Sequence, residues 1–431
     1  MAGLSRRALG RASVGAIVAA VTLARSGRSW AQEARRLRFG GYVESQEQLQ
    51  QTLAVLKRYE ELHPGVTINP EFTNFGAFTD KLATEATGGN APDMFSVNLD
   101  LMGEYSRRGV IQPLDQFVPK PLDLGDHVTS AVQANTREGK LWSIPNDCVS
   151  PVLVYATAAF EKSGVPVPEQ MWTWEKYAET ATALHKELGR KFWGTEDGSG
   201  SYIMLDLYLR AQGKMFFTAD RQLGFKPEDL TEWLVWWQKL REAGGVPPGD
   251  IQALATGDDL SRTGLISGRC AMLPQLTDSY VGLQNLTDAT LGMNMMPNGF
   301  AGAEMKSLHY AYAGNSTAVW SKTPHTELAI DIIRFMQMDP EGAGIFYNGS
   351  GMVPASAAGQ KWLRENGSDA DRRVLDYIAL VQKGGGTPRN PNFPGVSGVL
   401  RRMSENVAFG KATPAQAAAD FIAEAERRIK A

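Results

Sequence analysis

The sequence predicts a two-lobed α/β protein in which each lobe has a central, mostly parallel sheet flanked by helices. Three observations predict this fold class. The chain has 431 residues, of which 43% are hydrophobic, so it is long enough for two separate cores. Residues 37–98 alternate strand and helix patterns, which is typical of parallel strands. The stretch 139–155 is extended and stiffened by Pro145 and Pro151, as expected where a chain crosses between two domains.

The N-terminal residues 1–31 are predicted to be an export signal. Arg6 and Arg7 precede an apolar run at 12–23, and residues 29–31, Ser-Trp-Ala, match a cleavage site. The sequence around the two arginines resembles a twin-arginine signal, with a plain secretory signal as the alternative. The mature protein is therefore expected in the periplasm.

The charge of the mature chain narrows the set of partners. Removing residues 1–31 takes away five arginines and no acidic residues, which leaves 39 basic against 47 acidic residues and a net charge of −8. This balance disfavours nucleic acid and anionic membranes as partners. The five histidines are scattered, so no metal and no cofactor are expected. Cys148 and Cys270 are predicted either to form one bridge or to be buried free thiols.

The first elements form a strand-helix-strand unit. Residues 37–43 have strand composition, and Ser45 with Gln48 forms a capping box for a helix that ends at 63–65. A second strand starts at 66–68, so the two strands are predicted to be parallel.

The same order then repeats, with a loop at 73–76, a helix at 78–86 and a buried strand at 93–98. In open α/β sheets, ligands lie at the carboxyl ends of the strands. The candidate ligand-binding residues at these ends are Tyr42, Glu44, Asn74, Phe75, Asn98 and Asp100.

The extended stretch 139–155 is interpreted as a hinge between two lobes. Its polar tip, Asn146 and Asp147, is predicted to face a ligand cleft. The alternative is an ordinary strand of one sheet with a polar kink.

The second half of the chain continues the α/β pattern. Helices are predicted at 158–162 and 173–188, and a strand at 268–273. The helix at 230–240 is rich in tryptophan, which we interpret mainly as core rather than as a surface for ligand stacking. Residues from 324 and from 414 begin two further helices, each with proline at its start.

Five stretches, taken in their order and spacing, resemble one family. These stretches are 59–68; 88–93 with 104–114; 139–145 followed by Tyr155; 268–272; and 326–338 followed by 351–354. They resemble the periplasmic solute-binding proteins of ABC importers, in the carbohydrate-type group that includes the maltose-binding protein. The resemblance covers essentially the whole mature chain.

The resemblance implies the periplasmic-binding-protein fold, with three chain crossings between the lobes and a solute enclosed by hinge bending. It places the crossings near 147–151, 312–316 and 352–353. Lobe one would comprise 32–148 and 313–352, and lobe two 149–312 and 353–431. It further implies delivery to ABC permease subunits, and we expect a monomer.

The resemblance also assigns roles to particular residues. Asp100 falls where relatives bind sugar hydroxyls with a carboxylate, Asn146 and Asp147 fall at the hinge, and Ser201 with Tyr202 matches a loop that contacts sugar. The other candidate ligand-binding residues are Asp278, Tyr280, Asn315 and Arg401.

Two departures from maltodextrin binders argue against a long glucan. The stretch 277–280 and the pair Leu400 and Arg401 stand where those proteins place stacking aromatic residues. We therefore expect a smaller, more polar or acidic solute, with Arg401 gripping a carboxylate or two hydroxyls. The alternative is that Arg401 and Arg402 form a solvated helix face.

The rival interpretation is a secreted glycoside-active enzyme that uses Glu196, Asp197 and Asp278 as cleft carboxylates. No Gly-x-Ser-x-Gly, His-Glu-x-x-His or Cys-x-x-Cys motif is present. A structural or adhesion protein would show repeats, which are not found. Binding without catalysis is favoured, and replacing Asp100 or Asp147 with alanine is expected to weaken binding with little loss of stability.

Overall fold

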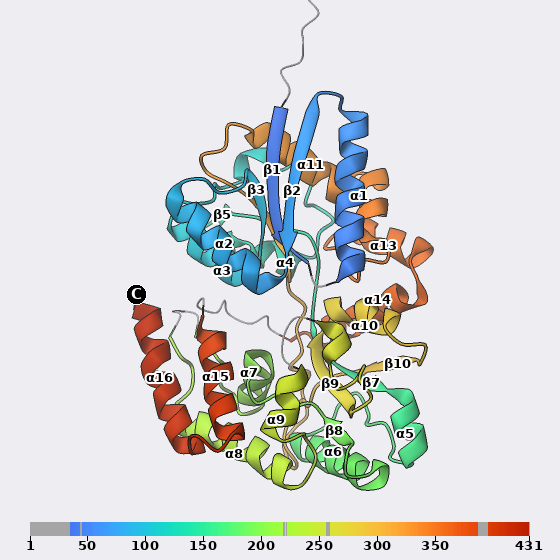
Figure 1. Cartoon of the computed structure of the whole chain (residues 1–431). Helices are drawn as coiled ribbons and strands as arrows, with labels where there is room; N and C mark the ends of the chain where they lie inside the picture. Colours follow the sequence, from blue (N-terminus) through green and yellow to red (C-terminus); the bar gives the residue numbers. More distant parts are fainter. Residues whose placement is uncertain are drawn as a thin grey trace, which may run out of the picture.

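The computed structural model describes residues 35–43, 45–218, 220, 222–255, 259–386 and 395–430. The predicted export signal and Glu44 therefore lie outside the described residues. Two sheets, each flanked by helices, form two halves of the molecule that stand one above the other (Figure 1). The predicted α/β class with two lobes is confirmed. Within the described residues, no helix combines the length and the apolar character needed to cross a membrane.

The upper half is built on a five-stranded sheet in the order β2-β1-β3-β11-β6. β1 pairs in parallel with β2 and β3, whereas β11 pairs antiparallel with β3 and β6. The strands are β1 (Arg35–Tyr42), β2 (Val66–Thr73), β3 (Met94–Val97), β6 (Ile144–Pro145) and β11 (Ser316–Val319). A separate ribbon joins β4 (Thr136–Arg137) to β5 (Lys140–Leu141). The predicted strand-helix-strand opening and its parallel pair are confirmed.

The lower half is built on a four-stranded sheet in the order β10-β7-β9-β8. Its strands are β7 (Pro151–Ala156), β8 (Trp193–Thr195), β9 (Cys270–Leu276) and β10 (Leu291–Asn294). β7 pairs antiparallel with both neighbours, and only β8 and β9 are parallel. The expectation of a mostly parallel sheet is therefore wrong for this half, because β7 enters directly from the hinge and runs against β9 and β10.

Helices cover both sheets. Those of the upper half are α1 (Gln46–Leu62), α2 (Phe75–Gly88), α3 (Leu99–Arg107), α4 (Thr129–Ala134), α11 (Thr326–Met338), α12 (Pro340–Tyr347) and α13 (Ala357–Asn366). Those of the lower half are α5 (Thr157–Ser163), α6 (Trp174–Leu188), α7 (Tyr202–Ala211), α8 (Pro227–Glu242), α9 (Gly249–Gln252), α10 (Tyr280–Asn285), α14 (Asp369–Gly384), α15 (Val396–Ala408) and α16 (Pro414–Lys430). The expected range 353–431 for the lower lobe includes α13, which packs against α12 of the upper half.

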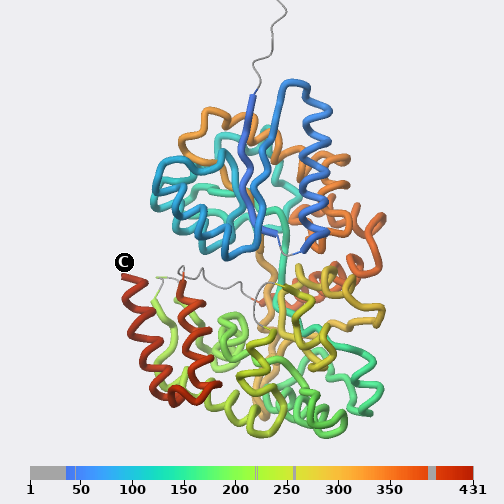
Figure 2. The backbone as a smooth tube through the Cα atoms, in the orientation of Figure 1, coloured from blue at the N-terminus to red at the C-terminus, as the bar shows by residue number. Residues whose placement is uncertain are grey.

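Two crossings between the halves, 146–149 and 312–315, lie side by side near the centre of Figure 2, and residues 353–355, which lead from α12 to α13, run beside them. Residues 146–149 form the middle segment, with 312–315 on one side and 353–355 on the other. The bonds that join them run from Asn146 N to Asn315 O at 2.9 Å, Val149 N to Tyr312 O at 2.8 Å, Cys148 N to Val353 O at 2.8 Å and Ala355 N to Asn146 O at 3.3 Å. The two central crossings and residues 353–355 therefore form a short three-stranded ribbon. The third passage between the halves lies between α13 and α14 rather than near 352–353, where the resemblance places it.

The tryptophans of α8 are core residues, as the sequence predicts. Trp233 and Trp237 are fully buried, and Trp174 of α6 packs edge-on against Trp233 with a ring-centroid distance of 5.6 Å. Burying large aromatic surfaces of this kind dominates the stability of a core. The lower half is thereby anchored around α6 and α8.

The two cysteines are free and buried, which decides between the alternatives that the sequence leaves open. Burial raises the pKa of both thiols, so neither is reactive in the folded protein. We expect native protein to show almost no reaction with a thiol reagent and guanidinium-unfolded protein to release two thiols per chain. A count near zero after unfolding, without added reductant, would contradict the free-thiol assignment.

Candidate ligand-binding cleft

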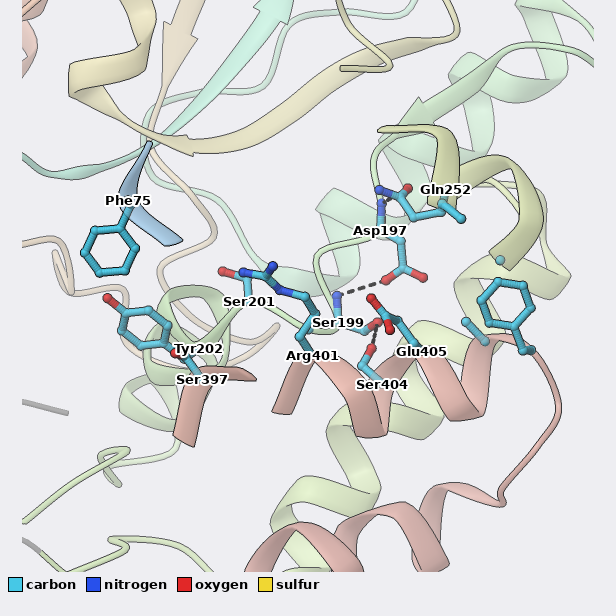
Figure 3. A pocket seen from close by; sticks show the side chains of 15 residues that line it. Phe75, Asp197, Ser199, Ser201, Tyr202, Gln252, Ser397, Arg401, Ser404 and Glu405 are labelled. Carbon is cyan, nitrogen blue, oxygen red and sulfur yellow. Dashed lines mark hydrogen bonds between the residues drawn. The ribbon is translucent and has the colours of Figure 1, made fainter. Parts of the chain in front are cut away.

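A cavity of about 600 Å³ lies between the two halves, on the side of α2, α7 and α15 (Figure 3). Its described lining residues are Phe75, Asp197, Ser199, Gly200, Ser201, Tyr202, Gly249, Gln252, Ala253, Ser397, Arg401, Ser404, Glu405, Ala408 and Phe409. Phe75 comes from the upper half and the others from the lower half. Four of the predicted ligand-binding residues, Phe75, Ser201, Tyr202 and Arg401, are brought together here.

A second cavity, of about 770 Å³, lies next to the first along the boundary between the halves. Its described lining residues are Val43, Ser45, Gln46, Glu47, Leu49, Phe72, Thr73, Asn74, Asp259, Leu260, Ser261, Arg262, Gly282 and Leu286. Asn74 lines this cavity and its neighbour Phe75 lines the first. The loop after β2 therefore separates two parts of one inter-lobe cleft.

Aromatic side chains from opposite halves line the first cavity. Phe75 is the first residue of α2, whose N-cap Asn74 accepts a hydrogen bond from Ala77 N–H. Its ring packs edge-on against Tyr42, 5.0 Å between centroids, so buried Tyr42 supports Phe75 rather than lining the cavity. Tyr202, the first residue of α7, lies on the same side of the cavity as Phe75 (Figure 3). Two such rings suit the apolar faces of a sugar.

The floor of the cavity is a buried polar network. Arg241 of α8 donates from Nε to Asp197 Oδ2 at 2.6 Å and from Nη2 to Ser199 Oγ at 3.0 Å. Ser199 Oγ also contacts Ser404 Oγ of α15, and its carbonyl accepts from Trp233 Nε1 at 2.8 Å. The loop that carries Ser201 is therefore fixed to two helices.

Arg401 lies on α15 at the rim of this cavity. The helix approaches the loop closely enough that a Cβ on Gly200 would lie 3.1 Å from Arg401 Cα, so glycine permits this contact. The Arg401 side chain is exposed and forms no ion pair with any described residue. Its neighbour Arg402 instead pairs with Glu424 at 2.5 Å. Only Arg401 of the two thus presents its charge to the cleft.

The Asp147 carboxyl group forms its hydrogen bonds within the hinge. Its Oδ1 accepts hydrogen bonds from the N–H groups of Gly314, at 3.0 Å, and Asn315, at 2.9 Å. Burial raises the pKa of Asp147 to about 8, with a further contribution from the negative charge of Asp278, although the two amide donors oppose the shift. The side chain is 2% exposed and lines neither of the cavities described above.

Asn146 likewise forms its hydrogen bonds with residues around the hinge. Its Oδ1 accepts from Thr317 Oγ1 at 2.9 Å and from Gln337 Nε2 at 2.6 Å, and its carbonyl accepts from Tyr347 Oη at 2.7 Å. These bonds tie the middle crossing to β11, α11 and α12. The crossing predicted from the prolines is present, and its polar tip holds the crossings together.

The remaining predicted residues line neither cavity. Asn98 is the N-cap of α3, and its Oδ1 accepts from the N–H groups of Asp100, at 3.1 Å, and Leu101. Asp100 lies in the first helical turn and is partly exposed. Tyr280 is fully buried and donates to Leu291 O at 2.7 Å. Asp278 and Asn315 also lie outside the two cavities, and Asn315 is buried at the hinge.

The carboxylates proposed for a glycosidase are held in separate environments. Glu196 is buried and accepts the Gly264 N–H, and burial raises its pKa. Asp197 is paired with Arg241. Burial raises the pKa of Asp278 to about 6, next to the hinge. Among the described residues, no group of three or more His, Cys, Asp or Glu side chains is placed to hold a metal.

Sequence reasoning missed several lining residues, among them Ser199, Gln252, Ser404, Glu405 and Phe409. Ser404 and Glu405 are three and four residues after Arg401, so they share its helix face. That spacing could have identified them once Arg401 was placed in the cleft. Ser199 and Gln252 carry no comparable local signal, because tertiary packing brings their loops together.

Comparison with known proteins identifies the family. A model of the bacterial extracellular solute-binding proteins matches residues 54–364, which is more than half of the chain. The chain therefore belongs to this family, whose members bind a solute for an ABC importer and are not enzymes. It is an extracytoplasmic solute-binding protein.

Individual relatives are distant but cover most of the chain. A putative binding protein of Brucella abortus is 21% identical over 382 residues, 87% of this chain and 89% of that protein. The sn-glycerol-3-phosphate-binding periplasmic protein of Escherichia coli K12 is 23% identical over 330 residues, 73% of this chain and 71% of that protein.

Two solved structures show the same fold. A periplasmic oligogalacturonide-binding protein from Yersinia enterocolitica, in complex with saturated digalacturonic acid, has a TM-score of 0.82 and 18% identity, covering 92% of this chain and 98% of that chain. The maltose/maltodextrin-binding domain from Bdellovibrio bacteriovorus, bound to maltotriose, has a TM-score of 0.72 and 19% identity, covering 92% and 100%.

Proposed function

We propose that this protein captures a sugar derivative carrying a negative charge, such as a sugar acid or a sugar phosphate, in the inter-lobe cleft. The observation that carries the proposal is the combination of Phe75, Tyr202 and Arg401 around one cavity between the halves, where Arg401 has no ion-pair partner among the described residues. The rings suit a sugar face, and a guanidinium binds a carboxylate or phosphate through two parallel hydrogen bonds. A neutral sugar bound through hydroxyls is the second candidate.

The relatives support an anionic solute. The Escherichia coli protein is named for sn-glycerol-3-phosphate, and the Yersinia enterocolitica structure contains digalacturonic acid. Both ligands combine hydroxyl groups with a negative charge. The positively charged Arg401 at the rim of the cleft is the feature of this chain that suits both anionic ligands.

The cleft would close by bending at the hinge ribbon. In the open form the cavity walls are wet, and the solute bonds to both lobes only when they meet, so binding shifts the equilibrium toward the closed form. The closed monomer would then be recognised by permease subunits after export by the twin-arginine route. The rigid bodies of this motion are the proposed lobe ranges 32–148 with 313–352, and 149–312 with 353–431, except that α13 moves with the first of them because it packs against α12.

Solute identity can be tested by mass spectrometry of the small molecules released when purified protein is mildly denatured. Candidate solutes are then assayed for a rise in melting temperature, because a ligand that binds only the folded state stabilises it. We expect hydroxylated anions to give the largest rise and to be recovered unchanged. Exclusive stabilisation by neutral sugars would contradict the proposed charge, and recovery of cleavage products would contradict binding without catalysis.

Replacing Arg401 with alanine is expected to weaken binding of the anionic solute about tenfold or more, which corresponds to about 1.4 kcal/mol or more. Arg402→Ala is the matched control, because Arg402 is the next residue, equally charged and paired with Glu424. Titration calorimetry should show unchanged affinity for this control. Equal losses in both variants would indicate a general electrostatic effect and would contradict a direct contact with Arg401.

A further inference from the structure

The chain leaves α12 through a tight turn, residues 347–350, that leads into the hinge ribbon. Ser350 N–H donates to Tyr347 O at 3.3 Å, and Ser350 Oγ donates to the same oxygen at 3.0 Å. Asn348 has φ −65° and ψ 111°, and Gly349 has φ 68°. These torsions are those of a type II turn, which needs a positive φ at its third residue and therefore favours glycine there.

The Asn348 side chain and the Gly349 nitrogen are both free to react. The Asn348 side chain is exposed and forms no hydrogen bond with the described residues. Gly349 N–H lies in the central peptide of the turn and has no acceptor in the described part of the chain. A Cβ built on Gly349 would have no heavy atom within 4 Å apart from its chain neighbours. Asparagine is thermolabile, and a following glycine has no side chain to shield its nitrogen.

The two groups can react with water as the only other reactant. Hydroxide removes the Gly349 N–H proton, and the nitrogen attacks Asn348 Cγ to form a C–N bond. The Cγ–Nδ2 bond breaks, and ammonia leaves with a proton from water, which restores the hydroxide. Water then opens the resulting succinimide ring. Opening at the main-chain carbonyl carbon gives isoaspartate, in which the chain runs through the side chain, and opening at Cγ gives aspartate. One water is consumed, one ammonia is released, and nothing is oxidised or reduced.

A second Asn-Gly pair, at Asn298, is held rigidly by the lower half. Asn298 is 2% exposed. Its Nδ2 donates to Met296 O at 3.1 Å, and its Oδ1 accepts from Leu308 N–H at 3.0 Å. Both ends of this amide are bonded, so it cannot turn toward the next nitrogen without breaking buried hydrogen bonds.

A third Asn-Gly pair, at Asn366, is held by the end of α13. Asn366 is exposed, but its Nδ2 donates to Trp362 O at 2.9 Å. Gly367 N–H, the nitrogen that would attack, donates to Leu363 O at 2.7 Å. Asn348 therefore differs from both other asparagines in having neither the amide nor the next nitrogen engaged.

The turn is bonded to the hinge at both of its ends. Tyr347, whose carbonyl closes the turn, donates from Oη to Asn146 O at 2.7 Å. Ser350 Oγ accepts from Met352 N–H at 3.2 Å, immediately before residues 353–355 of the hinge ribbon. Isoaspartate adds one carbon to the main chain, about 1.5 Å, between these two ends. The turn cannot keep its closing hydrogen bonds with this extra length, so both anchors are disturbed.

We propose that Asn348 is a deamidation site of the native protein, that it converts to isoaspartate by attack of the Gly349 nitrogen, and that this conversion loosens the hinge ribbon. Asn348 lines neither part of the solute cleft, so the proposal does not depend on the identity of the solute. The conversion would age the protein at its hinge while the chemistry of the cleft residues stays the same.

The first test follows the mature protein during incubation at mildly alkaline pH. Peptide mapping detects the mass gain when an amide nitrogen is replaced by oxygen, and electron-transfer fragmentation distinguishes isoaspartate from aspartate. We expect Asn348 to convert about tenfold faster than Asn298 and Asn366, a difference of about 1.4 kcal/mol in activation free energy. In guanidinium-unfolded protein the three should convert at similar rates, because each precedes glycine. Equal rates in the native protein, or a slower rate at Asn348, would overturn the assignment of the site.

The second test separates the extra main-chain carbon from the added charge. Asn348→Gln places the amide one carbon further from the backbone and so hinders ring closure, whereas Asn348→Asp adds the charge to an ordinary main chain. Both variants should fold, because this side chain is exposed. Hydrogen exchange is measured at the amides of Met352, bonded to Ser350, and Cys148, bonded to Val353.

Incubated wild-type protein is expected to exchange these two amides about tenfold faster than fresh protein, because their hydrogen bonds open more often. Incubated Asn348→Gln and fresh Asn348→Asp are expected to exchange like fresh wild type. Unchanged exchange in protein that contains isoaspartate at 348, or equally fast exchange in fresh Asn348→Asp, would contradict loosening by the extra main-chain carbon.

Discussion

Arg241→Met is expected to lower the free energy of unfolding by about 3–5 kcal/mol, the usual effect of removing one partner of a buried ion pair. The Asp197 and Arg241 side chains are 5% and 10% exposed, so the carboxylate left behind is largely shielded from water. Ser199 Oγ loses a donor at the same time. Denaturant unfolding followed by fluorescence measures this change.

The double variant Asp197→Asn with Arg241→Met is the control. It removes the uncompensated charge, so it should recover part of the lost stability if the ion pair is the cause. A double variant that is less stable than Arg241→Met would show that lost packing against α8 causes the effect instead. The single variant should also weaken solute binding, because the loop that carries Ser201 and Tyr202 loses its support.

Asp147→Ala is expected to lower the free energy of unfolding by about 2–4 kcal/mol, because one buried and one partly buried backbone amide lose their acceptor. These amides belong to Gly314 and Asn315 on the neighbouring crossing. The sequence alone favours lost binding with little lost stability; the hinge geometry instead predicts that stability is lost first. Wild-type stability in Asp147→Ala would contradict the role of this carboxyl group in the hinge.

Asp147→Asn separates the hydrogen bonds from the charge. The folded pKa of Asp147, about 8, lies above its unfolded value near 4, so the folded protein holds a proton that the unfolded chain releases. Stability contributed by this group is therefore complete below pH 4 and falls as pH rises toward 8, by at most about 1.4 kcal/mol per pH unit. Asparagine keeps the Oδ1 acceptor and cannot ionise. Unfolding free energies measured at pH 7 and pH 8 should differ less in Asp147→Asn than in the wild type.

Local patterns in the sequence predict the fold where short-range chemistry decides it. The Ser45 cap of α1, the parallel strands β1 and β2, and the buried tryptophans of α8 follow from capping, periodicity and hydrophobic burial. The direction of β7 is not a local property. Its Val-Leu-Val core is equally compatible with a parallel or an antiparallel neighbour, so only tertiary pairing fixes it.

The cleft is predictable only in part for a similar reason. Phe75, Tyr202 and Arg401 lie at helix starts or on an exposed helix face, where local sequence indicates their exposure. Asn146 and Asp147 are equally polar, but their side chains accept hydrogen bonds from backbone amides and side chains within residues 314–337. These partners are distant in sequence, so no local pattern reveals them. A polar residue at a crossing can form hydrogen bonds within the hinge or bind the solute, and only the folded structure shows which partners it has.

The most direct test of the account is a crystal structure of the protein with the solute identified from its own purification. The account predicts a hydroxylated anion enclosed between Phe75 of the upper half and Tyr202 of the lower half, with its negative group on Arg401. A solute that contacts only one half, or that lies outside this cavity, would contradict it.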